Sequence, residues 1–258
     1  MRKETIMYAR RTVLKGAGGI SLATILADPM LANAAASDLQ QVSLTTKGGR
    51  SVTASLALPS RAKAPTIVLV HEWWGLNNQI KAVAAEFAKQ GYVTLAIDLY
   101  NCKSSGDPSE AQRYMRQVKP AEATDALASW VAWLRRHERG NGKVATIGWC
   151  FGGGWSLNAS LAVPVDATVI YYGNVAKKAA QLGALKGPVQ GHFATRDGFI
   201  DKPMVEGFAK EMKAAGKRIE FHWYEADHGF ANPTTGRYDK PDADLAWKRT
   251  LTFLKNNV

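Results

Sequence analysis

The segment KVATIGWCFGGGW, residues 143–155, constrains the fold more than any other part of the chain. Its first half is apolar and partly β-branched, which suits a buried strand. Cys150 then stands between Gly148 and Gly152, the spacing of a nucleophile elbow, in which a strand turns sharply into a helix. Glycine suits these positions because a residue without Cβ lets the helix cross close to the strand. The segment therefore predicts a strand, a raised Cys150 side chain and a helix.

Two interpretations of Cys150 remain open at this point. In the first, the cysteine is a nucleophile, and the helix N-terminus behind the turn favours its thiolate over its thiol. In the second, a glycine-rich turn carries a buried structural cysteine, which is a common use of this residue. The rest of the chain has to decide between them.

The remainder of the chain, after the first 34 residues, alternates between strand and helix patterns. Residues 41–46 and 51–58 alternate in polarity around residues 47–50, which predicts an antiparallel hairpin. We expect an α/β fold with a doubly wound, mostly parallel sheet between two helical layers. The expected later strands are residues 66–70, 92–97, 144–148, 167–172, 188–194 and 218–224, and the expected helices are 78–90, 109–118, 121–137, 203–215 and 239–256, with one more after Cys150.

The N-terminus reads as a targeting segment. Arg10 and Arg11 precede an apolar run, residues 16–31, and Ala32-Asn33-Ala34 offers a small-x-small cleavage site. We expect residues 1–34 to be a cleaved twin-arginine export signal leading to the periplasm. An ordinary secretory signal or a retained amphipathic helix are the alternatives. Residues 35–258 are then expected to form a single domain.

Charge and cysteine content narrow the possible partners. The net charge is +11, but the lysines and arginines are scattered and no nucleic-acid motif is present, so we expect solvated surface charge and no nucleic acid. No apolar run of 18 residues predicts a membrane span. The two cysteines, Cys102 and Cys150, do not make a disulfide framework, and we expect both to be free.

Four polar residues follow predicted strands, where active groups of such sheets gather. They are Glu72, Cys150, Asp197 and His228. The order nucleophile, acid, histidine is that of the α/β-hydrolases. Asp201 is the rival for the acid, since either carboxylate could instead cap a loop. His228 could be an ordinary surface histidine, and Glu72 a buried carboxylate paired with a nearby cation.

With these residues in place, the chain from about residue 41 to residue 258 resembles the dienelactone hydrolase family. The resemblance rests on several motifs in the right order, namely HEWWG at 71–75, DLY at 98–100, GWCFGG at 148–153, YYG at 171–173, TRD at 195–197 and WYEADHGF at 223–230.

The resemblance implies a carboxymethylenebutenolidase-like hydrolase of small esters or lactones. It implies Cys150 as nucleophile, His228 as base and Asp197 as the orienting acid. Glu72 would contact the resting thiol. The backbone N–H groups of Phe151 and Trp73 would hold the oxyanion of a tetrahedral intermediate on the way to a thioester.

The substrate is less well defined. Family members that act on dienelactone grip its carboxylate with two arginines, where this chain has residues 101–103 (Asn-Cys-Lys) and Asn232. Lys103 or Arg237 could supply a charge, but neither reproduces a bidentate fork at those positions. An apolar or aromatic substrate group is expected from Trp73, Trp74, Trp149, Phe151 and Phe230.

No metal-ligand cluster or dinucleotide fingerprint is present, because the glycines at 152–154 lack the required spacing and acidic partner. We therefore expect no cofactor and no metal, and a monomer that acts on a small-molecule ester or lactone. Two other classes share the same scaffold. One is a non-catalytic binding or thiol-redox protein, and the other is an acyltransferase that uses the same acyl-enzyme.

Overall fold

The computed structural model describes residues 22–258. Arg10, Arg11 and most of the predicted export signal lie outside these residues. The described part begins with two helices, α2 (Leu22–Ala27) and α3 (Pro29–Ser37). Asp28 caps α3 by accepting a hydrogen bond of 2.8 Å from the N–H of Met30. Residues 32–34, the predicted cleavage site, lie within α3.

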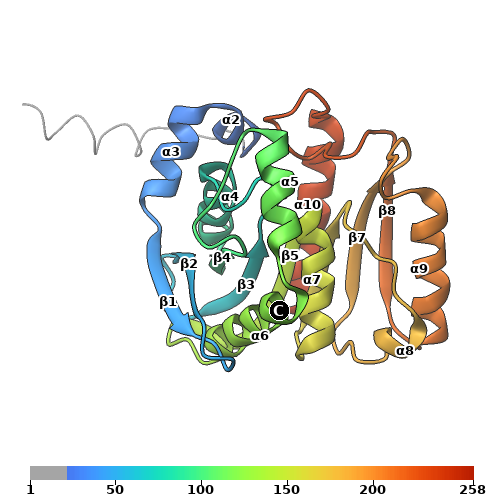
Figure 1. Cartoon of the computed structure of the whole chain (residues 1–258), viewed down its shortest axis with the longest axis horizontal. Coiled ribbons are helices and arrows are strands. Elements are labelled where there is room, and N and C mark those ends of the chain that lie inside the picture. Colours follow the sequence, from blue (N-terminus) through green and yellow to red (C-terminus); the bar gives the residue numbers. More distant parts are fainter. Residues whose placement is uncertain (1–21) are drawn as a thin grey trace, which may run out of the picture.

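One eight-stranded sheet organises the described chain, in the order β1-β2-β4-β3-β5-β6-β7-β8 (Figure 1). β1 pairs antiparallel with β2 and β2 with β4, whereas all later neighbours are parallel. This confirms the mostly parallel sheet with an antiparallel start. The strands are β1 (Gln40–Thr45), β2 (Ser51–Ala57), β3 (Ala64–Val70), β4 (Val93–Ile97), β5 (Gly140–Trp149), β6 (Ala167–Tyr171), β7 (Val189–Ala194) and β8 (Ile219–Tyr224).

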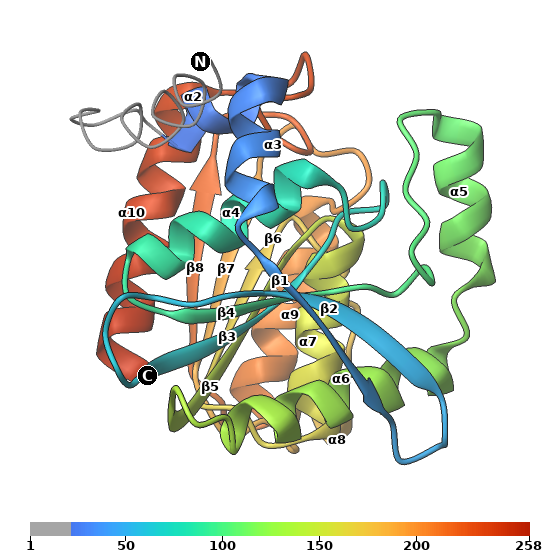
Figure 2. The ribbon, with the colours of Figure 1, turned by 90° about the vertical axis from the view of Figure 1, so that its left-hand side faces the viewer.

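Helices cover both faces of this sheet, which confirms the three layers expected of an α/β-hydrolase fold (Figure 2). One core joins the sheet to α4 and α10, while α6, α7 and α9 pack on the other face. The four-residue α8 was not predicted. The helices after α3 are α4 (Asn78–Lys89), α5 (Pro108–Gln117), α6 (Pro120–Arg135), α7 (Phe151–Ala162), α8 (Ala179–Leu182), α9 (Lys202–Ala214) and α10 (Lys240–Asn257).

Burial explains why the central strands read as continuous apolar runs. All five residues of β4 and all but one of β3 are buried, as expected for parallel strands covered on both faces. β1, at the edge of the sheet, instead alternates between exposed and half-buried positions. Within residues 22–258, no helix combines the length and the apolar character that a membrane crossing requires.

A row of stacked rings crosses four neighbouring strands on the α10 face. Trp149, Tyr171, His192 and His222 are direct register partners on β5, β6, β7 and β8. Their ring centroids are 5.2, 4.4 and 5.3 Å apart in that order. Thr250 of α10 hydrogen-bonds both Tyr171 (2.7 Å) and His192 (3.0 Å), so α10 is docked on this row by polar contacts as well as apolar ones.

Candidate active site

Cys150 occupies the sharp turn between β5 and α7. Its backbone has φ 53° and ψ −118°, a conformation that costs a non-glycine residue about 1–3 kcal/mol. The surroundings enforce it, because a Cβ on Gly148 would lie 2.1 Å from the carbonyl oxygen of Gly152. A Cβ on Gly152 would in turn lie 2.3 Å from the carbonyl oxygen of Val70. The glycines thus let α7 pass directly over β3 and β5, and the turn is the predicted elbow.

The pKa of the Cys150 thiol is determined by groups that act in opposite directions. Burial, and next the charge of Glu72, raise the pKa of Cys150 to about 12. The N–H of Phe151, which points at the sulfur, and the cation of Arg237 act in the opposite direction but do not compensate. The helix N-terminus therefore acts in the predicted direction, toward the thiolate. Burial and a nearby carboxylate outweigh a single backbone donor.

His228 and Asp197 come together from two separate loops. Asp197 follows β7, His228 follows β8, and Nδ1 of the histidine lies 2.7 Å from Oδ2 of the aspartate. The other oxygen, Oδ1, accepts hydrogen bonds from the N–H groups of Phe199 (2.8 Å) and Ile200 (2.9 Å). Although burial opposes ionisation, these bonds and His228 hold the pKa of Asp197 below its usual value. Because a carboxylate only accepts, Nδ1 carries a proton, and in the neutral ring the free lone pair is on Nε2.

Asp201, the rival acid, has a different task. Its Oδ1 accepts a hydrogen bond of 2.9 Å from the N–H of Met204 and caps the N-terminus of α9. The ion pair with His228 is made by Asp197. The structure thus brings His228 together with Asp197.

Glu72 lies two residues beyond β3 and is 5% exposed. Its Oε2 accepts a hydrogen bond of 2.5 Å from the amide of Asn232, and its Oε1 lies 3.4 Å from the hydroxyl of Tyr172. Burial raises the pKa of Glu72, and the Asn232 amide is the strongest influence opposing it. The alternative of a carboxylate bonded to a lysine or arginine is therefore not what the structure shows.

His71 is fully enclosed and supports the backbone. Its Nδ1 lies 2.6 Å from the carbonyl oxygen of Glu72, and its Nε2 accepts a hydrogen bond of 3.2 Å from the N–H of Leu99. Burial lowers its pKa, so the ring stays neutral and both nitrogens are used. His71 thus ties the end of β3 to the segment after β4.

Cys150, His228 and Glu72 line one cavity of about 840 Å³ at the carboxyl ends of the strands. One wall comes from α5, which stands apart from the helices that cover the sheet (Figure 2) and contributes Gln112 and Met115. The volume is that of a site for a small organic molecule.

The predicted aromatic lining is only partly correct. Trp73, Trp74 and Phe151 line the cavity, as do Trp155 and Phe199, which were not predicted. Trp149 instead faces the opposite side of the strand, where it stacks on Tyr171, and Phe230 is fully buried beneath the loop. Side chains alternate between the two faces of a strand, so Trp149, the last residue of β5, lies on the face away from the cavity.

Arg237 and Lys103, the two cations considered for the substrate site, lie in different places. Arg237 lines the cavity together with Lys177, whereas Lys103 lies outside it with its ammonium 5.6 Å from the ring centre of Tyr114. The predicted N–H donors lie at this cavity too. The N–H of Phe151 points at the sulfur, and the N–H of Trp73 has no partner among the hydrogen bonds of residues 22–258.

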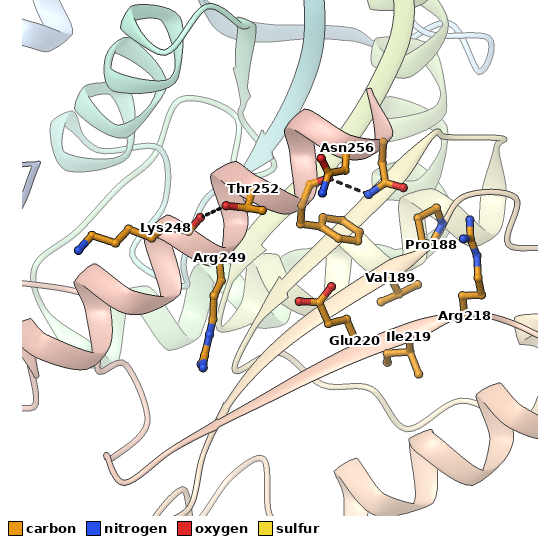
Figure 3. A pocket seen from close by; sticks show the side chains of 11 residues that line it. Pro188, Val189, Arg218, Ile219, Glu220, Lys248, Arg249, Thr252 and Asn256 are labelled. Carbon is orange, nitrogen blue, oxygen red and sulfur yellow. Dashed lines mark hydrogen bonds between the residues drawn. The ribbon is translucent and has the colours of Figure 1, made fainter.

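Two further cavities can be distinguished from this one. The first, of about 390 Å³, lies between α4 and α10, contains Trp149 and shares Glu72 and Asn232 with the main cavity. The second, of about 410 Å³, lies between α10 and the starts of β7 and β8 (Figure 3). There the cationic ends of Arg218, Arg249 and Lys248 point in different directions, so they do not converge on one ligand.

Sequence analysis missed three residues that contact the predicted groups. Asn232 was considered only for the arginine it replaces, yet it binds Glu72. The ring centroid of Tyr172, at φ 35°, lies 5.1 Å from that of His228, and the ring centroid of Phe199 lies 5.3 Å from that of His228. The YYG motif was the available signal for Tyr172; Phe199 had none.

Both cysteines are free, as predicted. Among residues 22–258, no group of three His, Cys, Asp or Glu side chains is arranged to hold a metal ion. The groups that converge in the main cavity are a thiol, an imidazole with a carboxylate behind it, and backbone donors. Such a set can deprotonate the thiol and transfer an acyl group to it.

Known proteins share this sequence and architecture. The dienelactone hydrolase family matches residues 52–258. A carboxymethylenebutenolidase from Pseudomonas putida is 29% identical and covers 83% of this chain and 94% of its own length. Another, from Pseudomonas sp. (strain P51), is 30% identical over the same shares of the two chains.

Solved structures agree with these matches. The crystal structure of a Klebsiella pneumoniae protein assigned as a dienelactone hydrolase superposes with a TM-score of 0.75 at 25% identity, covering 83% of this chain and 96% of that one. The chain therefore belongs to the dienelactone hydrolase family and is a hydrolase of that type.

Proposed function

We propose that the protein hydrolyses small esters or lactones through a Cys150–His228–Asp197 triad and a thioester acyl-enzyme. The observation that carries the proposal is the hydrogen bond of 2.7 Å between His228 and Asp197 at the edge of the cavity that contains Cys150. This bond fixes the tautomer in which Nε2 can accept a proton. The strained turn at Cys150 presents the sulfur to the same cavity.

The reaction has two stages in which protons and bonds balance. His228 Nε2 takes the thiol proton while the sulfur attacks the substrate carbonyl carbon. The tetrahedral intermediate then collapses, the carbon–oxygen bond to the alcohol breaks, and His228 returns the proton to the leaving oxygen. Water next attacks the thioester with His228 as base, and the acid leaves as the thiol is restored. For a lactone, the leaving alcohol stays attached to the acyl group.

Backbone donors would stabilise the oxyanion of both intermediates. The N–H of Phe151 points at the sulfur in the resting protein, and the N–H of Trp73 has no partner among the described residues. Both donors are therefore available at the turn and at the end of β3. Removing one such donor typically costs about 3–4 kcal/mol of barrier.

The high pKa of Cys150 makes deprotonation part of the chemical step. A thiol with a pKa of about 12 is almost wholly protonated at neutral pH, so the resting enzyme reacts slowly with other electrophiles. Attack then depends on His228 accepting the proton as the bond to carbon forms. A substrate that displaces Glu72 from the sulfur would remove part of the opposing charge.

The lining of the cavity supports a proposal for the substrate class. Trp73, Trp74 and Phe151 offer aromatic surface to an apolar or aromatic acyl or alcohol group, and Arg237 and Lys177 are the cations that line the same cavity. The Pseudomonas relatives are carboxymethylenebutenolidases. Dienelactone itself fits less well here, because Asn232 takes the place of a family arginine and is already bonded to Glu72.

The test is hydrolysis of p-nitrophenyl acetate and of a panel of simple lactones by the protein and by Cys150→Ala. We expect kcat/KM of the variant to fall by about 10³-fold or more, since the nucleophile is lost. The acylated protein should also show the mass of a thioester on Cys150 when the reaction is quenched in acid. Equal rates for the two proteins would remove the thiol from the mechanism.

The paired Arg10 and Arg11 support a further proposal, that the chain is exported to the periplasm by a twin-arginine route. We also propose that the protein is a monomer. Cell fractionation of the full chain and of a variant with both arginines changed to lysine tests the route, and light scattering of the purified protein tests the oligomeric state. Equal periplasmic yields of the two proteins would contradict the route, and a dimer mass would contradict the monomer.

A further inference from the structure

Asn232 lies at the boundary between the main cavity and the smaller one beside α4, and it is 2% exposed. It belongs to the loop that carries His228, four residues earlier. The backbone around it is held by turns, since its N–H donates to the carbonyl oxygen of Gly229 (2.9 Å) and its own carbonyl oxygen accepts from the hydroxyl of Thr235 (3.2 Å). The side chain therefore starts from a fixed position.

The orientation of the Asn232 amide is determined by its neighbours. Its Oδ1 accepts hydrogen bonds from Nε2 of Gln79 (2.8 Å), the N–H of Thr234 (2.9 Å) and the hydroxyl of Thr234 (2.7 Å). A flipped amide would place an NH₂ group against these three donors, which is unfavourable. The amide can thus present only its NH₂ to Glu72, which accepts from it at 2.5 Å.

Few titratable or charged groups face Glu72. His228 and Arg237 face it, and the Tyr172 hydroxyl contacts it. Cys150 faces Glu72 on one side and Asp197 more distantly, with Arg237 as the cation that also acts on it. Asn232 therefore gives Glu72 a strong donor without bringing a positive charge close to the sulfur. An arginine here would stabilise the carboxylate and the thiolate alike.

We propose that Asn232 is a positioning residue that, by donating its amide to Glu72, holds this group as a carboxylate beside Cys150 and keeps the resting thiol protonated. The inference rests on the proposed function in that it concerns the same nucleophile, but it is tested without substrate turnover. Gln79 and Thr234 contribute by fixing the amide.

The experiment measures alkylation of Cys150 by iodoacetamide between pH 6 and 10. All proteins carry Cys102→Ser, because Cys102 is exposed and free and would react as well. Without the Asn232 donor, the Glu72 carboxylate is less stable, so the proton resides more often on Glu72 than on the sulfur. We expect Asn232→Ala to be alkylated about tenfold faster near pH 8, equivalent to about one pKa unit.

A second background tests whether the effect passes through Glu72. In Glu72→Gln, Asn232→Ala should change the alkylation rate by less than about twofold, because the carboxylate on which it acts is gone. Thr234→Val, which removes one donor to Oδ1 of Asn232, should also accelerate alkylation, but by a smaller factor than Asn232→Ala. Asn256→Ala, on the exposed face of α10, is the matched asparagine control and should leave the rate unchanged.

Two results would overturn the inference. One is an unchanged alkylation profile in Asn232→Ala with a native near-ultraviolet circular dichroism spectrum. The other is the same acceleration in the presence and absence of the Glu72 carboxylate, which would indicate a general loosening of the loop. If Asn232→Ala does not fold, Thr234→Val and Gln79→Ala decide the question. Loss of the proposed esterase activity with the predicted alkylation pattern intact would refute the proposed function and leave this inference standing.

Discussion

Two histidines, one in the loop after β8 and one within the neighbouring strand β7, illustrate how differently the same side chain can be used. His228, after β8, has one nitrogen on the carboxylate of Asp197, and its side chain is 11% exposed at the cavity. His192, within β7, is fully buried, and both of its nitrogens are engaged. Its Nδ1 bonds the hydroxyl of Tyr224 at 2.8 Å, and its Nε2 bonds Thr250 at 3.0 Å.

The difference shows that a spare lone pair and a carboxylate behind the ring matter more than the ring itself. In the proposed mechanism Asp197 lets His228 gain a positive charge, and Nε2 of His228 has no hydrogen-bond partner among residues 22–258. His192 has neutral hydrogen-bonding partners, and burial lowers its pKa well below the usual value. It therefore stays neutral and holds β7 against α10. One histidine is the proposed proton acceptor, and the other has a packing role.

The largest expected effect is on His228. His228→Gln keeps a polar side chain of similar size but cannot take up a proton, so kcat/KM for p-nitrophenyl acetate should fall by about 10³–10⁴-fold. The thermal midpoint should change little. His192→Gln is the matched substitution, and it should lower the midpoint while leaving activity per folded molecule unchanged. Equal losses of activity in the two variants would contradict the different roles given to the two histidines.

The next effect distinguishes the two loop aspartates. Asp197→Asn should lower kcat by about 10²–10⁴-fold, because an amide no longer fixes the tautomer of His228 or stabilises its charged form. Asp201→Ala removes the cap of α9 and should cost about 1 kcal/mol of unfolding free energy with kcat retained. Steady-state kinetics and urea unfolding of both variants measure this contrast. A retained kcat in Asp197→Asn would leave His228 without its proposed orienting acid.

The smallest effect is a pH dependence of stability that arises from His192. The pKa of His192 is lowered in the folded protein, whereas the unfolded chain titrates near pH 6.5. As the pH falls, the unfolded state therefore takes up a proton at this histidine before the folded state does. The stabilisation from the neutral His192 is complete above about pH 6.5, and below that pH the free energy of unfolding falls by up to about 1.4 kcal/mol per pH unit. Urea unfolding between pH 5 and 8 measures how steeply the free energy of unfolding depends on pH. In His192→Phe this slope should be smaller than in the parent by the amount that corresponds to about one bound proton. His71, His137 and His222 also have lowered pKa values, so some slope remains.

Much of the fold was predictable because it depends on local patterns. Continuous apolar runs marked β3 and β4, and the glycines around Cys150 marked the elbow, since both features follow from burial and close backbone contact. The ends of these strands then placed the polar candidates at one edge of the sheet. The four-residue helix α8 was missed because a single turn has too little periodicity to be recognised.

The parts that were not predictable depend on directions and distances between remote segments. Trp149 is the last residue of β5 and directly precedes Cys150, but its side chain lies on the opposite face, where it meets Tyr171. Asn232 contacts Glu72 across 160 positions of sequence. The raised pKa of Cys150 arises from the combined burial and charge of such contacts, so no single motif could have revealed it.

The detached position of α5 has a consequence for engineering. Ala111 is its buried residue, yet Gln112 and Met115 form part of the cavity wall. A helix that lines the substrate space while contributing little to the interior can be exchanged or diversified at low risk to folding. Libraries directed at this helix should therefore yield altered selectivity with expression levels close to those of the parent enzyme.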